Sequence, residues 1–257
     1  MNKYLLFCTL ALSCSLLSAQ QATVTGPDKN LKVDISVKSG KPFYSVTYKN
    51  NIILENSPLG FITDIGDFSN NISYVEQKSS SINKTYVQDR IKHSVIKYNA
   101  NELKITFCNA DKHPFDVVFR VSNNDIAFRY EIPQHGERAS IVMKSETTGF
   151  DFPENTTTFI CPQSKPMVGW KRARPSYEEE YKPDEPTSTP SQFGEGYTFP
   201  CLFHIGNNWA LVSETGVRSK YCASHLSDAS DNGLYTITFP NENEMNGLGS
   251  STPGLAL

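Results

Sequence analysis

The segment from Gly169 to Tyr181 gathers the side chains of this chain that are best suited to chemistry. It places aromatic rings, arginines and three adjacent glutamates in the order GWKRARPSYEEEY. Arginine forks and aromatic faces suit sugars and carboxylates, and carboxylate oxygens suit Ca²⁺ or another oxygen-seeking cation. The residue types therefore predict the rim of a carbohydrate or metal site. The alternative interpretation is a hydrated acidic loop, since runs of like charge are commonly just solvated.

The chain around this segment favours a long ordered loop over a helix or a central strand. The stretch from Pro162 to Phe199 is rich in prolines and charges, and the run Pro183 to Pro190 contains three prolines. Proline removes a backbone donor and fixes φ, which excludes helix interiors and central strands. Long loops inside compact domains are usually functional. We therefore expect the acidic segment to project from a β-rich scaffold.

Apolar side chains alternate with a period of two along most of the remaining chain, and no long stretch shows helical periodicity. This pattern is typical of half-buried strands separated by Asn-, Gly- and Pro-rich turns. Many short antiparallel strands predict an all-β fold, specifically a large β-sandwich. The stretch Val118 to Ile132 predicts a hairpin that closes over Ser122 to Asp125. The expected strands lie at residues 31–37, 43–48, 91–98, 103–107, 116–121, 126–132, 209–212 and 235–239.

The first residues predict export. Met1 to Lys3 form a short basic start, Tyr4 to Leu17 is an apolar stretch too short to span a bilayer stably, and Ser18-Ala19 offers small residues for cleavage. We expect residues 1–20 to be a secretory signal peptide that leads to the periplasm. The alternative is lipid attachment at Cys14, which would anchor the protein at the outer membrane. No later segment has the apolar length that a transmembrane helix requires.

Cysteines and net charge limit the remaining classes of function. Cys108, Cys161, Cys201 and Cys222 follow the leader, so one or two disulfides are allowed but none is required. Their spacings match no zinc pattern. The formal net charge of −3 and the lack of a basic stripe argue against nucleic acid as a partner.

The composition also predicts where the folded unit ends. Residues 21–243 hold the strand pattern, whereas residues 244–257 are rich in Gly and Ser. We expect 21–243 to form one domain and 244–257 to begin a linker that leaves it.

The order of these features resembles the N-terminal domain of glycoside hydrolase family 97. The resemblance rests on the leader, the opening strands with Ser57-Pro58-Leu59-Gly60, the segment Trp170 to Tyr181, and the run Trp209 to Val217. It spans nearly all of the chain after the leader. The resemblance implies a β-super-sandwich akin to galactose mutarotase, followed in full-length enzymes by a catalytic (β/α)8 barrel. Members are exported α-glucosidases and α-galactosidases of gut-type Bacteroidetes that degrade polysaccharides.

The same resemblance implies a divided active site. The family's catalytic carboxylates and most of its calcium ligands lie in the barrel, so no catalytic residue is assigned to this chain. The N-terminal domain contributes one glutamate to the active-site Ca²⁺, and its position after Tyr177 transfers that role to Glu178, with Glu179 and Glu180 as substitutes. Trp170, Arg174 and Tyr177 are the candidates for contact with an oligosaccharide substrate. A Trp beside Gly169 can equally anchor the loop on the sandwich.

Two other functions remain open from the sequence. A free-standing carbohydrate-binding β-sandwich has the same strand pattern. A mutarotase-like sugar epimerase has the same fold, and its chemistry needs a histidine and a glutamate that converge on one face. The sequence does not distinguish glucoside from galactoside, or an inverting from a retaining reaction, because hydrolysis needs two carboxyl groups across the sugar ring that are not identified here.

Overall fold

The computed structural model describes residues 21–164, 179–217, 223–228, 233–240 and 255–256. Within these ranges the chain forms strands, turns and loops and contains no helix, which confirms the all-β prediction. The strands are β1 Gln21–Thr25, β2 Leu31–Lys38, β3 Lys41–Tyr48, β4 Asn51–Pro58, β5 Phe61–Thr63, β6 Gly66–Asp67, β7 Ser73–Val87, β8 Val95–Cys108, β9 Pro114–Val121, β10 Ile126–Glu131, β11 Val142–Glu146, β12 Gly149–Asp151, β13 Thr157–Pro162, β14 Glu185–Pro186, β15 Tyr197–Ile205, β16 Asn208–Val212, β17 His225–Leu226, β18 Leu234–Thr238 and β19 Leu255–Ala256.

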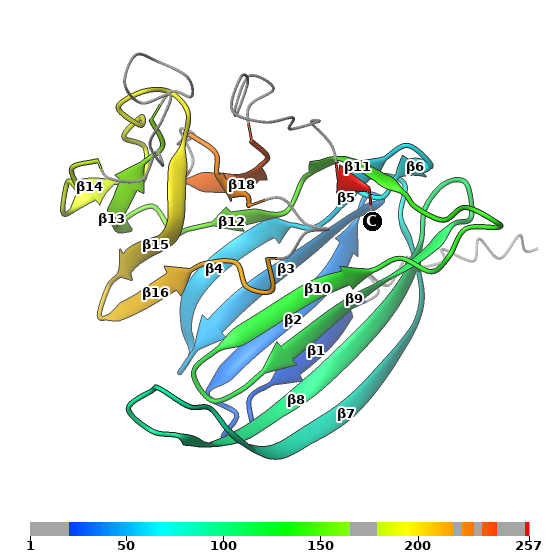
Figure 1. The fold of residues 1–257 in the computed structure, drawn as a ribbon, viewed down its shortest axis with the longest axis horizontal. Helices are drawn as coiled ribbons and strands as arrows, with labels where there is room; N and C mark the ends of the chain where they lie inside the picture. Colours follow the sequence, from blue (N-terminus) through cyan, green and yellow to red (C-terminus); the bar gives the residue numbers. More distant parts are fainter. Residues whose placement is uncertain (1–20, 165–178, 218–222, 229–232, 241–254, 257) are drawn as a thin grey trace, which may run out of the picture.

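Two antiparallel sheets, β1-β2-β3-β4 and β10-β9-β8-β7, form the main body of the protein (Figure 1). Strands that neighbour each other in these sheets follow each other in sequence, so tight turns can join them. The turn between β3 and β4 consists of Lys49 and Asn50, both with positive φ. Two left-handed residues match the right-handed twist of the flanking strands, and the register is thereby fixed.

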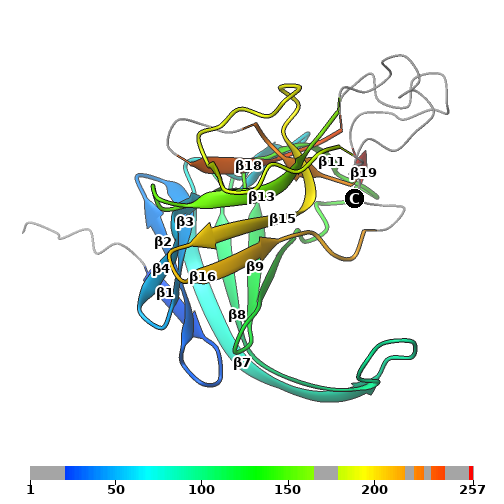
Figure 2. The ribbon, with the colours of Figure 1, turned by 90° about the vertical axis from the view of Figure 1, so that its left-hand side faces the viewer.

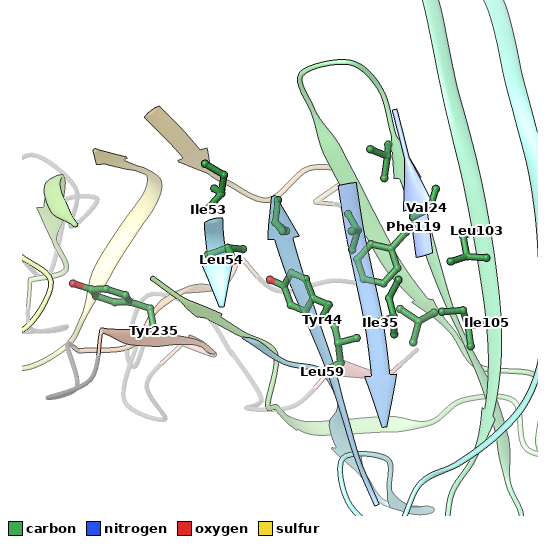
Figure 3. Close-up of a cluster of buried hydrophobic side chains, with 14 of the residues drawn as sticks. Val24, Ile35, Tyr44, Ile53, Leu54, Leu59, Leu103, Ile105, Phe119 and Tyr235 are labelled. Carbon is green, nitrogen blue, oxygen red and sulfur yellow. The ribbon is translucent and has the colours of Figure 1, made fainter. Parts of the chain in front are cut away.

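The core lies between these two sheets, where alternate side chains of each strand meet. Val33 and Ile35 from β2 and Ile105 and Phe119 from β8 and β9 are all at most 2% exposed. Figure 3 shows Ile35 and, from the opposite sheet, Ile105 and Phe119 pointing toward one another. The ring of Tyr44 lies 5.8 Å from that of Phe119, in the tilted geometry that aromatic rings favour. Period-two alternation in the sequence therefore becomes a sandwich with one apolar interior.

A second, smaller layer extends the sandwich at one end. It contains the sheet β19-β11-β5-β6 and a seven-stranded sheet with β12-β18-β17-β15-β13-β14, in which β16 pairs with β15. Phe152 stacks on Phe203 at 3.9 Å beneath this sheet. Its connection to the main body includes the hydroxyl of Tyr44, which donates to the carbonyl of Gly149 at 2.9 Å. The Tyr44 hydroxyl in the main core thus holds β12, which belongs to the seven-stranded sheet of the second layer.

Most strands expected from the sequence are present with small shifts of their ends, but the strands placed at 91–98 and 103–107 are parts of one continuous strand, β8. The hairpin at Val118 to Ile132 is confirmed: β9 pairs with β10, and the Ser122 amide donates to the Asp125 carbonyl at 2.9 Å. One expectation was wrong in part, because the strand placed at 91–98 begins only at Val95 and residues 91–94 belong to a turn. The alternation there continues into a turn whose side chains are exposed, so no burial selects a strand.

The described cysteines form no disulfide. Cys108, Cys161 and Cys201 are reduced in the structure, and Cys222 lies outside the described residues. In the described part of the chain, no helix is long and apolar enough to cross a membrane. The predicted signal peptide at 1–20 and most of the predicted linker at 244–257 also lie outside the described residues.

The central aromatic ring of the sandwich provides a test of the core. Phe119→Ala should lower the free energy of unfolding by about 3–5 kcal/mol, because it removes a fully buried ring and leaves a cavity between the sheets. Urea denaturation followed by circular dichroism measures the change. Ile52→Ala is the control, since Ile52 is 53% exposed and its truncation should change stability by less than about 0.5 kcal/mol. Equal effects of the two variants would contradict the assigned core.

Candidate functional site

The acidic segment lies in the long excursion between β13 and β15. Trp170, Arg174, Tyr177 and Glu178 fall within residues 165–178, outside the described residues, so their roles remain predictions. The described chain resumes at Glu179 and includes Glu180 and Tyr181. The described residues therefore show how the two ends of the segment are attached to the sheet.

Both ends of the excursion are held against the end of β13. On the leading side, Ser164 is fully buried, and the amide of Gln163 donates to the carbonyl of Gly196 at 2.8 Å. On the returning side, the Cys161 thiol donates to the carbonyl of Glu179 at 3.7 Å, and the ring of Tyr181 stacks on that of Phe159 at 4.8 Å. The described residues on both sides of 165–178 are therefore attached to the same end of β13.

A pocket of about 360 Å³, which includes its open mouth, lies beneath the returning chain. Its floor is formed by β13 and β15, and its wall is formed by residues 180–192. The Thr189 hydroxyl donates to a Glu185 carboxylate oxygen at 3.1 Å, and the Tyr197 hydroxyl donates to the carbonyl of Thr189 at 2.9 Å. The lining combines carboxylates, an ammonium group and hydroxyls: Thr158, Ile160, Pro162, Glu180, Lys182, Glu185, Thr189, Pro190, Ser191, Gln192 and Tyr197.

The described lining of this pocket does not by itself make a metal centre. Glu180 lies at the pocket together with Lys182, which partly balances its charge. Ca²⁺ requires six to eight oxygen ligands, and the described residues contain no group of three or more His, Cys, Asp or Glu side chains that could hold a metal ion. The run Glu178 to Glu180 offers only oxygen donors, which fit calcium.

Glu146, at the end of β11, is a second candidate feature that the sequence did not indicate. Partial burial raises the pKa of Glu146 to about 7, the nearby charge of Glu214 acts in the same direction, and a hydrogen bond with Thr148 opposes both. The Thr148 hydroxyl is also 2.6 Å from that of Tyr130, which accepts from the amide of Gly60 at 2.8 Å. Glu146 thus ends a buried polar network that connects β11 with β10. Because Glu146 lies in an ordinary alternating strand, its place in the sequence does not predict the raised pKa.

Glu214 has a structural role that explains its place in a turn. Its carboxylate accepts from the amide of Ser224 at 2.9 Å and from the Ser224 hydroxyl at 2.7 Å. These bonds join the loop after β16 to the strand β17. The structure brings the charges of Glu146 and Glu214 close enough to interact, although 68 residues separate them in sequence. A carboxyl with a raised pKa, such as that of Glu146, is found in functional regions as well as in structural networks.

The comparisons define the class of this protein. Residues 24–253 match the family model described as "Glycosyl-hydrolase 97 N-terminal". The chain therefore belongs to the family of glycoside hydrolase 97 N-terminal domains, which confirms the family resemblance and the expected β-super-sandwich.

Relatives with known structures extend this assignment. The crystal structure of a beta-arabinopyranosidase is 53% identical, covers 93% of this chain and 38% of its own, and has a TM-score of 0.88. A family 97 enzyme from Pseudoalteromonas sp., solved in complex with panose, is 23% identical, covers 85% of this chain and 32% of its own, and has a TM-score of 0.72. The second likeness is evidence for the fold alone.

Two curated relatives are alpha-galactosidases. A probable retaining alpha-galactosidase of Streptomyces bingchenggensis is 26% identical over 91% of this chain and 34% of its own length. A retaining alpha-galactosidase of Bacteroides thetaiotaomicron is 27% identical over 61% of this chain and 22% of its own length. This chain spans about a third or less of the length of these relatives.

Glu146 provides a pH-dependent test of this candidate feature. A folded pKa of about 7 against an ordinary value of 4.5 means that the fold favours the protonated carboxyl. The stability that this proton contributes is complete below about pH 4.5 and is lost as the pH rises through 7. Glu146→Gln, which mimics the protonated form, should therefore be more stable than the wild type at pH 8, by at most about 3 kcal/mol.

Thermal unfolding of both proteins between pH 4 and pH 8 measures this difference. It should be small at pH 4 and grow with pH. Glu137→Gln, at an exposed loop position, is the control and should show no such growth. A constant difference across the range would show that Glu146 ionises normally in the folded protein.

Proposed function

We propose that this chain is the N-terminal domain of an exported, calcium-dependent glycoside hydrolase whose active site is completed by a catalytic barrel. The observation that carries the proposal is the 53% identity, across 93% of this chain, to a beta-arabinopyranosidase whose own chain is longer. In this proposal the domain supplies a structural support and one glutamate, Glu178, to the calcium site. The barrel supplies the catalytic carboxylates.

The names of the relatives narrow the proposed substrate. A β-L-arabinopyranoside has the same ring hydroxyl arrangement and the same orientation of the scissile bond as an α-D-galactopyranoside, and it lacks only the hydroxymethyl group. The beta-arabinopyranosidase and the two alpha-galactosidases therefore act on stereochemically equivalent sugars. We favour this pair of substrates over an α-glucoside, which differs at one ring hydroxyl.

The described part of the site supports a role in calcium binding at the level of its chemistry. Residues 178–180 carry consecutive carboxylates, and the carbonyl of Glu179 is tied to the buried Cys161. This bond holds the backbone at Glu179, the residue that directly follows Glu178 in the sequence. When bound, Ca²⁺ would supply a fixed positive charge, while the glutamate of this chain would help hold the ion. The export to the periplasm, with or without a lipid on Cys14, remains part of this proposal.

The calcium role is tested by Glu178→Gln in a chimera that joins this chain to the rest of the beta-arabinopyranosidase. The amide keeps the shape of the carboxylate but removes a full charge from the metal's ligands. Calcium affinity measured by calorimetry should fall about tenfold or more, and activity should fall with it. Glu179→Gln and Glu180→Gln are matched controls with the expectation of smaller effects. If all three leave calcium affinity and rate unchanged, the acidic run is a hydrated loop.

A second function, free-standing carbohydrate binding, is favoured by one observation. The outer face of β13, β15 and β16 carries two stacked ring pairs, Phe159 with Tyr181 and His204 with Trp209. Trp209 is 57% exposed although the ring of His204 lies parallel to it at 4.1 Å. An indole with a free face is a platform on which the apolar face of a sugar ring can pack.

Affinity electrophoresis of the chain in gels that contain arabinogalactan tests this function. Under the carbohydrate-binding hypothesis the polysaccharide retards the chain, and Trp209→Ala removes the retardation. Ile52→Ala, at an equally exposed position on β4, should leave retardation intact. If the wild-type chain migrates without retardation, the carbohydrate-binding hypothesis is wrong. The proposal of a domain within a larger enzyme then stands alone.

A further inference from the structure

The strands β7 and β8 continue well beyond the sheet to which they belong. They pair with each other from Ser73 and Cys108 as far as Val87 and Val95, whereas β9 pairs with β8 only as far as Asn101. Residues Ile82 to Ala100 therefore form a two-stranded ribbon with a turn at its tip, here called the arm. Figures 1 and 2 show the arm extending away from the body. An isolated two-stranded ribbon is at best marginally stable in water.

The outer face of the sheet is charged where it belongs to the body. Leu103 and Ile105 of β8 point into the core. Glu102 and Lys104, which alternate with them, therefore point to the outer face. Glu102 accepts from Arg120 at 2.6 Å. Lys104 forms ion pairs with Asp116 at 2.6 Å and Glu131 at 3.0 Å. Val118, the cross-strand partner of Lys104, is only 2% exposed, so the charged side chains form the water-facing layer of this face.

On the arm, the same face becomes apolar. Alternation from Glu102 places Ala100, Tyr98 and Ile96 on it, and their cross-strand partners are Ile82, Lys84 and Tyr86. On this face Tyr86 is 48% exposed, Ile82, Ile96 and Tyr98 are half-buried, and Ala100, next to the body, is buried. The opposite face holds polar pairs, Asn83 with Asn99 and Thr85 with Lys97, and a pair of valines at the tip. An apolar face on an unsupported ribbon marks a surface that another element covers.

The arm curves toward the outer face of its own sheet. Figure 2 shows the sheet β1–β4 on one side of β7 and β8 and the arm bending to the other side. The strand β19, which pairs with β11 through Val142 and Met143, lies on that same side. In the longer relatives, two thirds or so of the polypeptide lies outside the matched region. A chain that continues from β19 therefore starts on the side toward which the apolar face of the arm is turned.

We propose that the arm is a clasp for the polypeptide that follows this domain in the full-length enzyme, with Tyr86, Ile96 and Tyr98 as its principal contacts. The inference rests on the proposed function, since it needs a following domain. The arm carries Lys84, Arg90, Lys92 and Lys97 against a single acidic residue, Asp89, in a chain of net charge −3. The surface that it grips should therefore be an apolar patch bordered by carboxylates.

The charge of the arm also bears on the alternative occupant, a second copy of this chain. A symmetric contact between two arms would bring two sets of basic residues together, which is unfavourable. The remaining possibility is that each arm lies on the acidic body of another copy. Sedimentation of the isolated chain distinguishes that arrangement.

The test compares amide hydrogen exchange of the arm in two proteins: this chain by itself, and a chimera in which it replaces the aligned region of the beta-arabinopyranosidase. Exchange at Ile82 to Ala100 should slow at least about tenfold in the chimera, because burial of the ribbon suppresses local opening. Tyr86→Ser with Ile96→Ser, a cross-strand pair on the apolar face, should reverse this protection. It should lower the Tm of the chimera and leave the Tm of the isolated chain unchanged.

A matched control changes the neighbouring pair on the polar face, Thr85→Ala with Lys97→Ala, and should leave protection and Tm intact. If the arm exchanges equally in both proteins while other surfaces of the domain become protected, the clasp is wrong and the proposed function stands. If no surface becomes protected, both are wrong. Dimers of the isolated chain that the apolar-face variant abolishes would overturn the clasp in favour of a second copy.

If the chimera does not fold, a binding experiment replaces the exchange measurement. The isolated chain is then titrated with the beta-arabinopyranosidase polypeptide that lacks its aligned region, and the two arm variants are compared. The clasp requires the apolar-face variant to bind at least about tenfold more weakly than the polar-face variant. Equal binding by both variants, or absence of binding by the wild-type chain, would refute it.

Discussion

The burial of one face of β7–β10 against one face of β1–β4 is the constraint on which the rest of the structure depends. Val33 and Ile35 of β2, Ile105 of β8 and Phe119 of β9 come from both sheets, and each loses its contact with water only when the two sheets meet. The tight turns fix which residues oppose each other within a sheet. The apolar interior then fixes which face of each sheet turns inward, and no strand can shift by one residue without reversing that choice.

The second layer depends on this sandwich through a few directed bonds. The hydroxyl of Tyr44 leaves the core to bind the Gly149 carbonyl, and the Ser57 hydroxyl accepts from the Asp151 amide at 2.9 Å. These contacts set β12 beside β4, and the aromatic cluster of Phe152, Phe203 and Tyr235 completes the layer. The strand β13, which holds both ends of the acidic excursion, is thereby placed relative to the main core. A rigid scaffold under a polar loop is the common arrangement of functional sites.

Several surfaces of the domain have a chemistry that suits contact with other polypeptide or with sugars. The arm turns an apolar face toward the side on which β19 lies, and Glu146 holds a perturbed carboxyl near the loop that Glu214 fixes. Charged pairs cover the neighbouring outer face of the sheet, so the apolar arm is a local change of surface chemistry and not a general property of the fold. The relatives that match this chain extend well beyond the region aligned with it.

The sequence by itself determined the class of fold, most strand positions, the hairpin at Ser122 to Asp125 and the family. These follow from local rules: alternation selects strands, and Asn, Gly and Pro select turns. Tertiary structure alone decided the pKa of Glu146, the attachment of Glu179 to Cys161 and the length of the arm. Each depends on residues distant in sequence, such as Glu214 near Glu146, or on the point where β9 stops pairing with β8. Local pattern specifies a strand and its faces, whereas desolvation and strand pairing are set only by what packs beside it.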